Sequence, residues 1–372
     1  MSDQHAGLAD VIAGQSAICT VGKEGRGLSY RGYAIEALAQ QTCFEEVAYL
    51  LLYGELPTAN ELVAFSQRLV AQRGLPAPLR EILEKLPASS HPMDVLRSAC
   101  SVLGCLEAES ETRQQTAIAE RLLAMLPAAL LYWYHYQQQQ RRIDTRLQQP
   151  DIAGYFLALL HQSEISDAHR HALDVSLTLY AEHEFNASTF AARVSASTLS
   201  DFYSCVTSAI GTLRGPLHGG ANEATMAFIG NMTDADNAEQ EVLRTLTAHE
   251  KIMGFGHRVY KESDPRNAVI KPLSAQLATT HPDGHLYAIS ERVESVMWRE
   301  KRLFPNLDFY SASLYHFLGI PVSLYTPVFV CSRVSGWAAH IMEQRAHNRL
   351  IRPAADYTGP AERTLTPLAQ RR

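Results

Sequence analysis

The sequence predicts an all-α protein, and three observations support this prediction. Apolar residues recur at helical spacing in many segments, glycine and proline separate these segments, and alternating strand-like runs are scarce. The chain has 372 residues, whereas a single hydrophobic core rarely grows beyond about 250–300 residues. We therefore expect two helical domains.

The expected elements follow one another in a regular way. The best strand candidate is short, at residues 17–21. Residues 44–57 (FEEVAYLLLYGELP) then place apolar side chains three or four positions apart and end at a glycine and a proline. The same spacing returns at residues 156–160, 175–179 and 314–318. Each of these ranges predicts a helix with one buried face.

Three segments invite a different interpretation. Residues 122–136 (LLAMLPAALLYWYHY) are strongly apolar, but they are shorter than the roughly 20 residues of a membrane span, and Pro127 interrupts them. A buried core helix is the better prediction. Residues 137–150 are polar and of low complexity, which predicts a solvated connection. Residues 22–27 (GKEGRG) lack the spacing of a phosphate-binding loop and predict a turn.

Composition excludes several classes of protein. With 46% hydrophobic and 19% charged residues the chain is not wholly disordered, and its net charge of −6 provides no surface for nucleic acid or an anionic membrane. The six cysteines form no C-x-x-C pair, so neither a zinc ribbon nor a redox pair is expected. Residues 1–10 lack the basic and apolar run of a signal peptide, so a cytoplasmic location is expected.

Fifteen histidines raise the question of a metal site. His-Glu dipeptides occur at residues 183–184 and 249–250. A helical zinc site would need a second histidine four positions after the first, and Ala187 and Met253 stand there instead. No metal ion is expected.

Four segments place reactive side chains among small or rigid residues. They are GPLHGG at 215–220, GFGHRVYKESDPR at 254–266, PNLDFYS at 305–311 and CSRVSGW at 331–337. Taken alone, each has an ordinary structural explanation: a buried histidine at a turn, a solvated basic loop, a helix cap and an arginine on a helix surface. The residues themselves leave these alternatives open.

Together the segments resemble the citrate synthase family, in which they occur in this order and at similar spacing. The likeness continues through AEHEFNAST at residues 181–189 and covers nearly the whole chain. Residues 88–97 and 337–360 look most like the bacterial 2-methylcitrate synthases, a branch that uses propionyl-CoA. Arg258 and Lys261 instead look like ordinary citrate synthases, which use acetyl-CoA, because many methylcitrate enzymes carry proline in this stretch.

The resemblance implies a two-domain all-α fold, with a large domain at residues 1–220 and 320–372 and a smaller mobile domain at 221–319. It also implies the chemistry of the site. Asp308 would remove the α-proton of the thioester, and His218 would donate a hydrogen bond to the thioester oxygen. His257 would polarise the ketone of oxaloacetate. The acyl-CoA is a substrate, and no cofactor is implied.

The resemblance further implies binding residues and a homodimer. The carboxylates of oxaloacetate would be held by His183, Arg266 and Arg333 of one subunit and by Arg352 of the other. CoA would lie along Glu250, Lys251, Ile252, Met253 and Gly254, with Lys261 at a phosphate. Arg68 and Arg73 are weaker candidates for ligand contact.

Three alternatives remain open at this point. The first is a citrate synthase that prefers acetyl-CoA, because one methylene changes binding by only about 1–3 kcal/mol. The second is a non-catalytic relative that keeps the fold. The third is a metal-dependent hydrolase.

Overall fold

The structure is a computed structural model that describes residue 7, residues 11–22 and residues 27–371. It is mostly helical, which confirms the all-α prediction. The helices of the first half are α1 (Ile35–Gln41), α2 (Phe44–Tyr53), α3 (Ala59–Ala71), α4 (Ala77–Lys85), α5 (Pro92–Leu106), α6 (Gln115–Gln139), α7 (Ile152–His161), α8 (Asp167–Tyr180), α9 (Ala187–Ser197) and α10 (Phe202–Leu213). Those of the second half are α11 (Ala221–Ile229), α12 (Ala235–Thr247), α13 (Pro265–Ala278), α14 (His285–Lys301), α15 (Leu307–Phe317) and α16 (Tyr325–Ala346), with short 3₁₀ turns at Val322–Leu324 and Leu368–Gln370.

A small antiparallel sheet precedes the helices. It pairs β1 (Cys19–Val21) with β2 (Leu28–Tyr30) and β2 with β3 (Tyr33–Ala34). The strand candidate at residues 17–21 is therefore confirmed. The predicted turn at 22–27 lies largely outside the described residues, which include only Gly22 and Gly27 at its two ends. The N–H of Gly22 donates to the carbonyl of Gly27 at 2.9 Å.

Helix α6 explains the apolar segment at residues 122–136. It is the one helix in the described chain that is long and apolar enough to cross a membrane, but 89% of its most apolar window is buried inside the protein. Pro127 lies within the helix, where every neighbouring side chain from Leu122 to Tyr132 is buried. The prediction of a core helix is confirmed.

The polar connection at residues 137–150 was predicted to be solvated, and this is only partly right. Helix α6 continues to Gln139, and in the irregular part Ile143 and Thr145 are buried. The buried guanidinium of Arg73 donates hydrogen bonds to the carbonyl oxygens of Leu147 and Gln149 at 2.7 and 2.6 Å. The polar composition did not reveal that this arginine holds the connection against the core.

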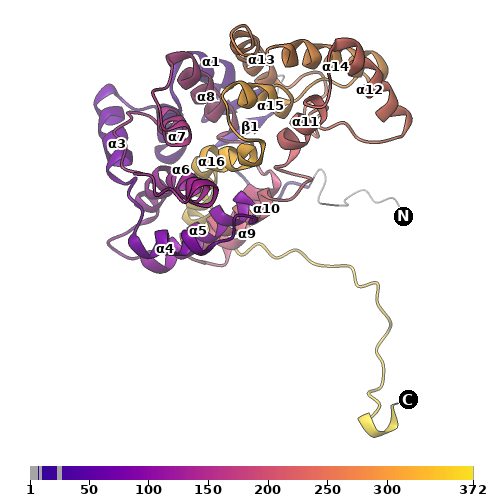
Figure 1. Ribbon diagram of the computed structural model, residues 1–372. Helices are drawn as coiled ribbons and strands as arrows, with labels where there is room; N and C mark the ends of the chain where they lie inside the picture. The colour runs from indigo at the N-terminus through magenta and orange to yellow at the C-terminus, as the bar shows by residue number, and fades with distance from the viewer. Residues whose placement is uncertain (1–6, 8–10, 23–26, 372) are drawn as a thin grey trace.

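The helices form two groups (Figure 1). Helices α11 to α15, drawn in the orange range, pack on one another at one end of the molecule, while α16 lies among α2, α6, α8 and α9 in the rest. Helix α13 also contacts α1 and α8, so the two groups share an interface. The domain boundaries at 220 and 320 stay a prediction. Beyond α16 the chain is extended and exposed, and it runs away from the body (Figure 1).

Candidate active site

Asp308 lies in the first turn of α15 and is not the cap of that helix. The cap is Asn306, whose side-chain oxygen accepts a hydrogen bond from the N–H of Asp308 at 3.1 Å. The hydroxyl of Tyr180 donates to Oδ1 of Asp308 at 2.6 Å. Burial raises the pKa of Asp308, while the Tyr180 bond and the charge of Arg266 oppose this rise. The raised pKa makes this carboxylate a stronger base than an exposed one.

The loop that carries His257 is tied to the start of α15. The N–H of Asn306 donates to the carbonyl of Gly254 at 2.9 Å, and its side-chain amide donates to the carbonyl of Gly256 at 3.0 Å. Gly254 has φ +87°, and a Cβ atom there would lie 2.8 Å from Oγ1 of Thr225. The conformation and the space both require glycine, so the motif places His257 relative to Asp308.

His257 is neutral and has a defined tautomer. The N–H groups of Val259 and Tyr260 donate to its Nδ1 at 3.0 and 3.1 Å. Because Nδ1 accepts both bonds, the ring proton lies on Nε2. Burial, followed by the nearby charge of Arg266, lowers the pKa of His257 to about 4.

His218 is also neutral but has the opposite tautomer. The N–H of Ser188, in the first turn of α9, donates to its Nε2 at 3.2 Å, and the hydroxyl of Ser188 lies 2.8 Å from the same nitrogen. The indole of Trp337 donates to that hydroxyl at 3.1 Å. The ring proton therefore lies on Nδ1. Burial, and then the charge of Arg333, lowers the pKa of His218 to about 4.

The turn that follows His218 is tightly fixed. The N–H of Gly219 donates to the carbonyl of Leu213 at 3.0 Å, and a Cβ atom at Gly219 would lie 2.3 Å from that oxygen. The carbonyl of Gly219 accepts from the hydroxyl of Thr326 at 3.2 Å, and Glu223 also contacts that hydroxyl. This turn joins the end of α10 to α11 and α16, where the two groups of helices meet.

His183 lies beside His257, with ring centroids 5.0 Å apart. Its Nε2 is 3.2 Å from the hydroxyl of Tyr260. Burial lowers the pKa of His183, and the charge of Arg266 adds to the effect. The structure thus gathers neutral imidazoles around positive charge, an arrangement suited to a ligand that brings negative charge.

Arg266 is held in place by Asp264, the N-cap of α13. Oδ1 of Asp264 accepts from the backbone N–H and from Nε of Arg266, both at 3.0 Å, and Oδ2 accepts from Nη2 at 2.8 Å. Oδ2 also accepts the N–H of Leu307 at 3.1 Å, which links this pair to α15. The pair uses two of the five N–H groups of the guanidinium, so three remain for a ligand.

Arg333 approaches the same place from α16. Its Nε donates to the carbonyl of Tyr180 at 2.7 Å, and its guanidinium lies over the ring of Phe329, 4.6 Å from the centroid. Phe329 also packs against Tyr180 and His218, at centroid distances of 4.5 and 6.5 Å. Through these contacts the structure brings together six residues predicted from five separate segments: His183, His218, His257, Arg266, Asp308 and Arg333.

The predicted CoA residues 250–254 directly precede His257 in the sequence. Glu250 and Lys251 are exposed, Ile252 and Met253 are half-buried, and Gly254 is buried. Lys261 is exposed, and its ammonium group donates to the carbonyl of Arg258 at 3.1 Å. Their contact with CoA stays a prediction.

Arg68 and Arg73 do not belong to the site, and both expectations are corrected. Arg68 pairs with Glu120 through bonds of 2.8 and 2.9 Å. Arg73 is 1% exposed. Its guanidinium donates to backbone carbonyls and lies over the ring of Tyr155, 3.9 Å from the centroid. Both stabilise the first half of the chain. A hollow of about 1060 Å³ lies in this region, next to α3, but none of the six gathered residues lines it.

Arg352 lies on the extended segment after α16 and is exposed. It forms no ion pair with a described residue of its own chain. Its predicted position in the site of a partner subunit therefore stays a prediction.

A buried chain of hydrogen-bonded polar groups was not predicted from the sequence. Oε1 of Glu182 lies 2.9 Å from Nε2 of His340, whose Nδ1 is 2.9 Å from the guanidinium of Arg193. Arg193 in turn pairs with Glu343 at 2.7 Å. Glu182 and His340 are both fully buried, and Glu182 directly precedes His183 in the sequence. The only signal was the position of Glu182 in the AEHEFNAST segment, and nothing in the sequence pointed to its partner.

Comparisons with known proteins agree with this geometry. The family described as "Citrate synthase, C-terminal domain" matches residues 7–354. A 2-methylcitrate synthase from Shewanella oneidensis is 56% identical over 98% of both chains, and citrate synthase 2 from Bacillus subtilis is 43% identical over 98% of both. Among solved structures, citrate synthase from Thermoplasma acidophilum, in a ternary complex with carboxymethyl-coenzyme A and oxaloacetate, has a TM-score of 0.90. It shares 32% identity over 97% of this chain and 98% of its own.

The match over nearly the whole length, together with the gathered histidines, arginines and aspartate, leads to one conclusion. This chain belongs to the citrate synthase family.

Proposed function

We propose that this enzyme condenses oxaloacetate with propionyl-CoA and hydrolyses the resulting thioester to give 2-methylcitrate and CoA, with acetyl-CoA as a second substrate. One observation carries the proposal. Two neutral imidazoles of opposite tautomer, His218 and His257, belong to the same cluster as the buried carboxylate of Asp308. The identity of 56% to a 2-methylcitrate synthase favours the propionyl substrate.

The first step removes a proton from the α-carbon of the thioester. Oδ1 of Asp308 accepts the Tyr180 hydroxyl, so Oδ2 is the oxygen that takes the proton. Negative charge then develops on the thioester oxygen, and a placed hydrogen-bond donor must stabilise it. Nδ1–H of His218 is that donor, because its Nε2 is occupied by the N–H of Ser188.

The second step forms the carbon–carbon bond. Nε2–H of His257 donates to the ketone oxygen of oxaloacetate and makes the ketone carbon electrophilic. The α-carbon attacks it, and the ketone oxygen takes up the proton that Asp308 had removed from the α-carbon, which gives the hydroxyl of the product and restores the carboxylate. Water then cleaves the thioester and releases CoA. No step requires a metal ion or a cofactor, so we propose that turnover is independent of both.

Oxaloacetate carries two carboxylates, which need charged partners in a buried site. Arg266 keeps three N–H groups beyond its pair with Asp264, and Arg333 keeps both Nη groups beyond its bond to Tyr180. We assign one carboxylate to these arginines together with His183. The other would be met by Arg352 of a partner subunit.

The acyl substrate is tested by kcat/KM for propionyl-CoA and acetyl-CoA at saturating oxaloacetate. We expect the propionyl substrate to be preferred, with both turned over, because the two differ by one methylene. A strong preference for acetyl-CoA would establish the second candidate, an ordinary citrate synthase. Arg258 and Lys261 are the residues that favour that candidate.

Substrates should bind in order. His257, Arg266 and Asp308 lie on the segment from α11 to α15 or its loops, whereas His183, His218 and Arg333 lie outside it. Movement of the first group onto the second would assemble the site and exclude water. Affinity for CoA should therefore rise when oxaloacetate is present. Equal CoA affinity with and without oxaloacetate would contradict ordered closure.

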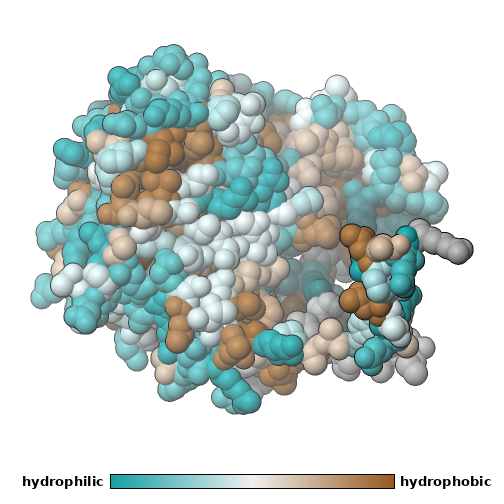
Figure 2. All heavy atoms as spheres, turned by 90° about the horizontal axis from the view of Figure 1, so that it is seen from below, coloured by the Kyte–Doolittle hydropathy of each residue, from teal (hydrophilic) through white to brown (hydrophobic). Residues whose placement is uncertain are grey.

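We propose that the active unit is a homodimer. The exposed segment after α16 runs clear of its own body (Figure 1), and Arg352 lies shortly after the end of α16 at Ala346. The face seen in Figure 2 shows a broad pale area with apolar patches, in the region of α4, α5 and α9. A groove of about 410 Å³ between α5 and α10 is lined mainly by small residues, among them Ser101, Gly104 and Ser208. Small side chains allow helices of two subunits to pack closely.

Mixed dimers test whether Arg352 acts across the interface. Asp308→Asn and Arg352→Ala should each be nearly inactive alone, and mixing them should restore one intact site per mixed dimer. That site would combine Asp308 of one chain with Arg352 of the other. No recovery after exchange of subunits would show that Arg352 acts within its own chain or not at all.

We also place the enzyme in the cytoplasm. All six cysteines are free, as expected of a protein in a reducing compartment. Fractionation of the producing cells tests this assignment.

A further inference from the structure

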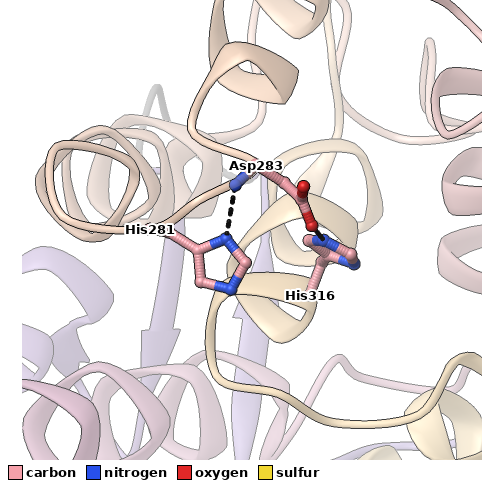
Figure 3. A group of neighbouring side chains, drawn as sticks. All are labelled: His281, Asp283 and His316. Carbon is pink, nitrogen blue, oxygen red and sulfur yellow. Dashed lines mark hydrogen bonds and ion pairs between the residues drawn. The ribbon is translucent and has the colours of Figure 1, made fainter.

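His281, Asp283 and His316 meet in a cluster that contains none of the proposed catalytic residues (Figure 3). His281 and Asp283 lie on the turn between α13 and α14, and His316 lies in the last turn of α15. One ligand atom from each residue lies within 4.8 Å of the other two, and all three residues are half-buried. They are 35 positions apart at most in the sequence, with none of the spacings of a helical zinc motif.

We propose that these three side chains form a binding site for a divalent transition metal ion, with Zn²⁺ as the ion of best fit. Two imidazoles and one carboxylate are a donor set that suits Zn²⁺ better than Mg²⁺ or Ca²⁺, which prefer oxygen alone. Water would complete the coordination, since the residues are partly exposed. Nothing in the proposed reaction uses this site.

The local structure holds the donors in place. The N–H of Asp283 donates to Nδ1 of His281 at 3.1 Å, and the ring of His281 packs on Phe317 with centroids 5.2 Å apart. The turn also needs Gly284, because a Cβ atom there would lie 2.1 Å from the carbonyl of Ala278. This turn therefore places two of the donors near each other before a metal binds.

The distances are close to those of a zinc site. Nε2 of His316 lies 2.8 Å from Oδ2 of Asp283, and a metal would replace the proton that they share. Ligand atoms around tetrahedral Zn²⁺ are about 3.3 Å apart, from Zn–N bonds of about 2.0–2.1 Å. The close pair must open by about half an ångström and His281 must approach by up to about 1.5 Å, which side-chain torsions allow.

Binding to His281 has a cost that limits the affinity. Its Nδ1 accepts the N–H of Asp283, so coordination through Nε2 moves the ring proton to Nδ1 and breaks that bond. With three protein ligands and one lost hydrogen bond, we expect a Kd on the order of 1–10 μM.

The site is separate from catalysis but lies on the same helix as Asp308. Eight residues separate Asp308 from His316, about 12 Å along a helix at 1.5 Å per residue. A metal here would tie the last turn of α15 to the turn before α14. It should therefore stabilise this end of the molecule.

The test is zinc binding by the full-length protein after removal of metals with a chelator, measured by competition with a chromophoric chelator at neutral pH. The wild-type protein should take up one equivalent of Zn²⁺ and show a higher Tm with it. The double variant His281→Gln/His316→Gln should bind at least about 30-fold more weakly, because each replacement removes an imidazole while an amide keeps the polar contacts. His285→Gln, an exposed histidine beside the same turn, is the matched control and should bind within twofold of wild type.

X-ray absorption on the zinc-loaded wild type keeps the test independent of how the variants fold. The expected shell contains two imidazoles and oxygen. No saturable binding, an affinity unchanged in the double variant, or a shell containing sulfur would each overturn the proposal.

Discussion

His218 and His257 have the same task in the proposed reaction but are held by opposite means. The donors to Nε2 of His218 come from Ser188 in α9, supported by Trp337 in α16. The donors to Nδ1 of His257 come from Val259 and Tyr260 in its own loop. One imidazole is oriented by helices distant in sequence, and the other by the backbone that immediately follows it.

The difference explains how one site can aim two neutral rings at two substrates. The tautomer of each ring is set by which nitrogen meets a backbone N–H, so His218 presents Nδ1–H and His257 presents Nε2–H. Burial keeps both rings uncharged near neutral pH. Because the supports differ, side-chain substitutions should be able to disturb the orientation of His218 but not that of His257.

The largest effect should come from removing either ring. His218→Ala and His257→Ala should each lower kcat by about 100–1,000-fold, the usual loss of one donor to developing charge. His171→Ala, which alters an exposed histidine on α8, is the control and should leave kcat unchanged. The measurement is the initial rate of CoA release with propionyl-CoA and oxaloacetate. A loss of kcat in only one of the two variants would contradict the proposal that both histidines stabilise developing charge.

The tautomers themselves can be observed. Nuclear magnetic resonance of ¹⁵N-labelled histidine should show the proton on Nδ1 of His218 and on Nε2 of His257, with both rings titrating near pH 4. Because the folded-state pKa values lie below the ordinary 6.5, the contribution of these rings to stability is complete above pH 6.5. It is lost as the pH falls towards 4. The same tautomer in both rings, or titration near pH 6.5, would contradict the description.

A smaller effect should separate the two kinds of support. Ser188→Ala removes the hydroxyl 2.8 Å from His218 but leaves the backbone donor, so we expect kcat to fall about 10-fold with little change in KM. Trp337→Phe, which removes only the indole donor, should lower kcat less. No side-chain replacement can remove the hydrogen-bond donors to His257, because both are backbone N–H groups. An unchanged kcat in Ser188→Ala would mean that the backbone bond alone positions His218.

The smallest effect on catalysis is expected for a substitution that touches neither histidine nor its supporting residues. Arg68→Ala breaks the pair with Glu120, and since the arginine side chain is 45% exposed, the loss of stability should be about 1 kcal/mol or less. The value of kcat/KM for both substrates should stay within twofold of wild type. A tenfold rise in KM would instead return Arg68 to the ligand site.

The same contrast explains what could be predicted from the sequence. Helical periodicity predicted α2, α7 and α8. The motifs at 215–220, 254–266 and 305–311 located His218, His257 and Asp308 once their resemblance to one family was recognised, because such motifs are local features of the sequence. Contacts between distant segments left no such signal. Tyr180 meets Asp308 across 128 positions, Trp337 meets Ser188 across 149, and His340 meets Glu182 across 158.

The predictions for Arg73 and for the connection at 137–150 were wrong for the same reason. A charged residue and a polar stretch both indicate the surface when considered alone, but the guanidinium and the carbonyls satisfy one another in the interior. The chemistry of a site is thus easier to recognise in the sequence than the contacts that hold it in place.

The central claim is that Asp308 is the base between the two histidines. The direct measurement is the rate of oxaloacetate-dependent CoA release by Asp308→Asn, which keeps the shape of the side chain and its contact with Tyr180. The rate should fall by at least about 1,000-fold while oxaloacetate still binds, because an amide cannot take the α-proton. A rate within tenfold of wild type would contradict the assignment of Asp308 and the mechanism built on it.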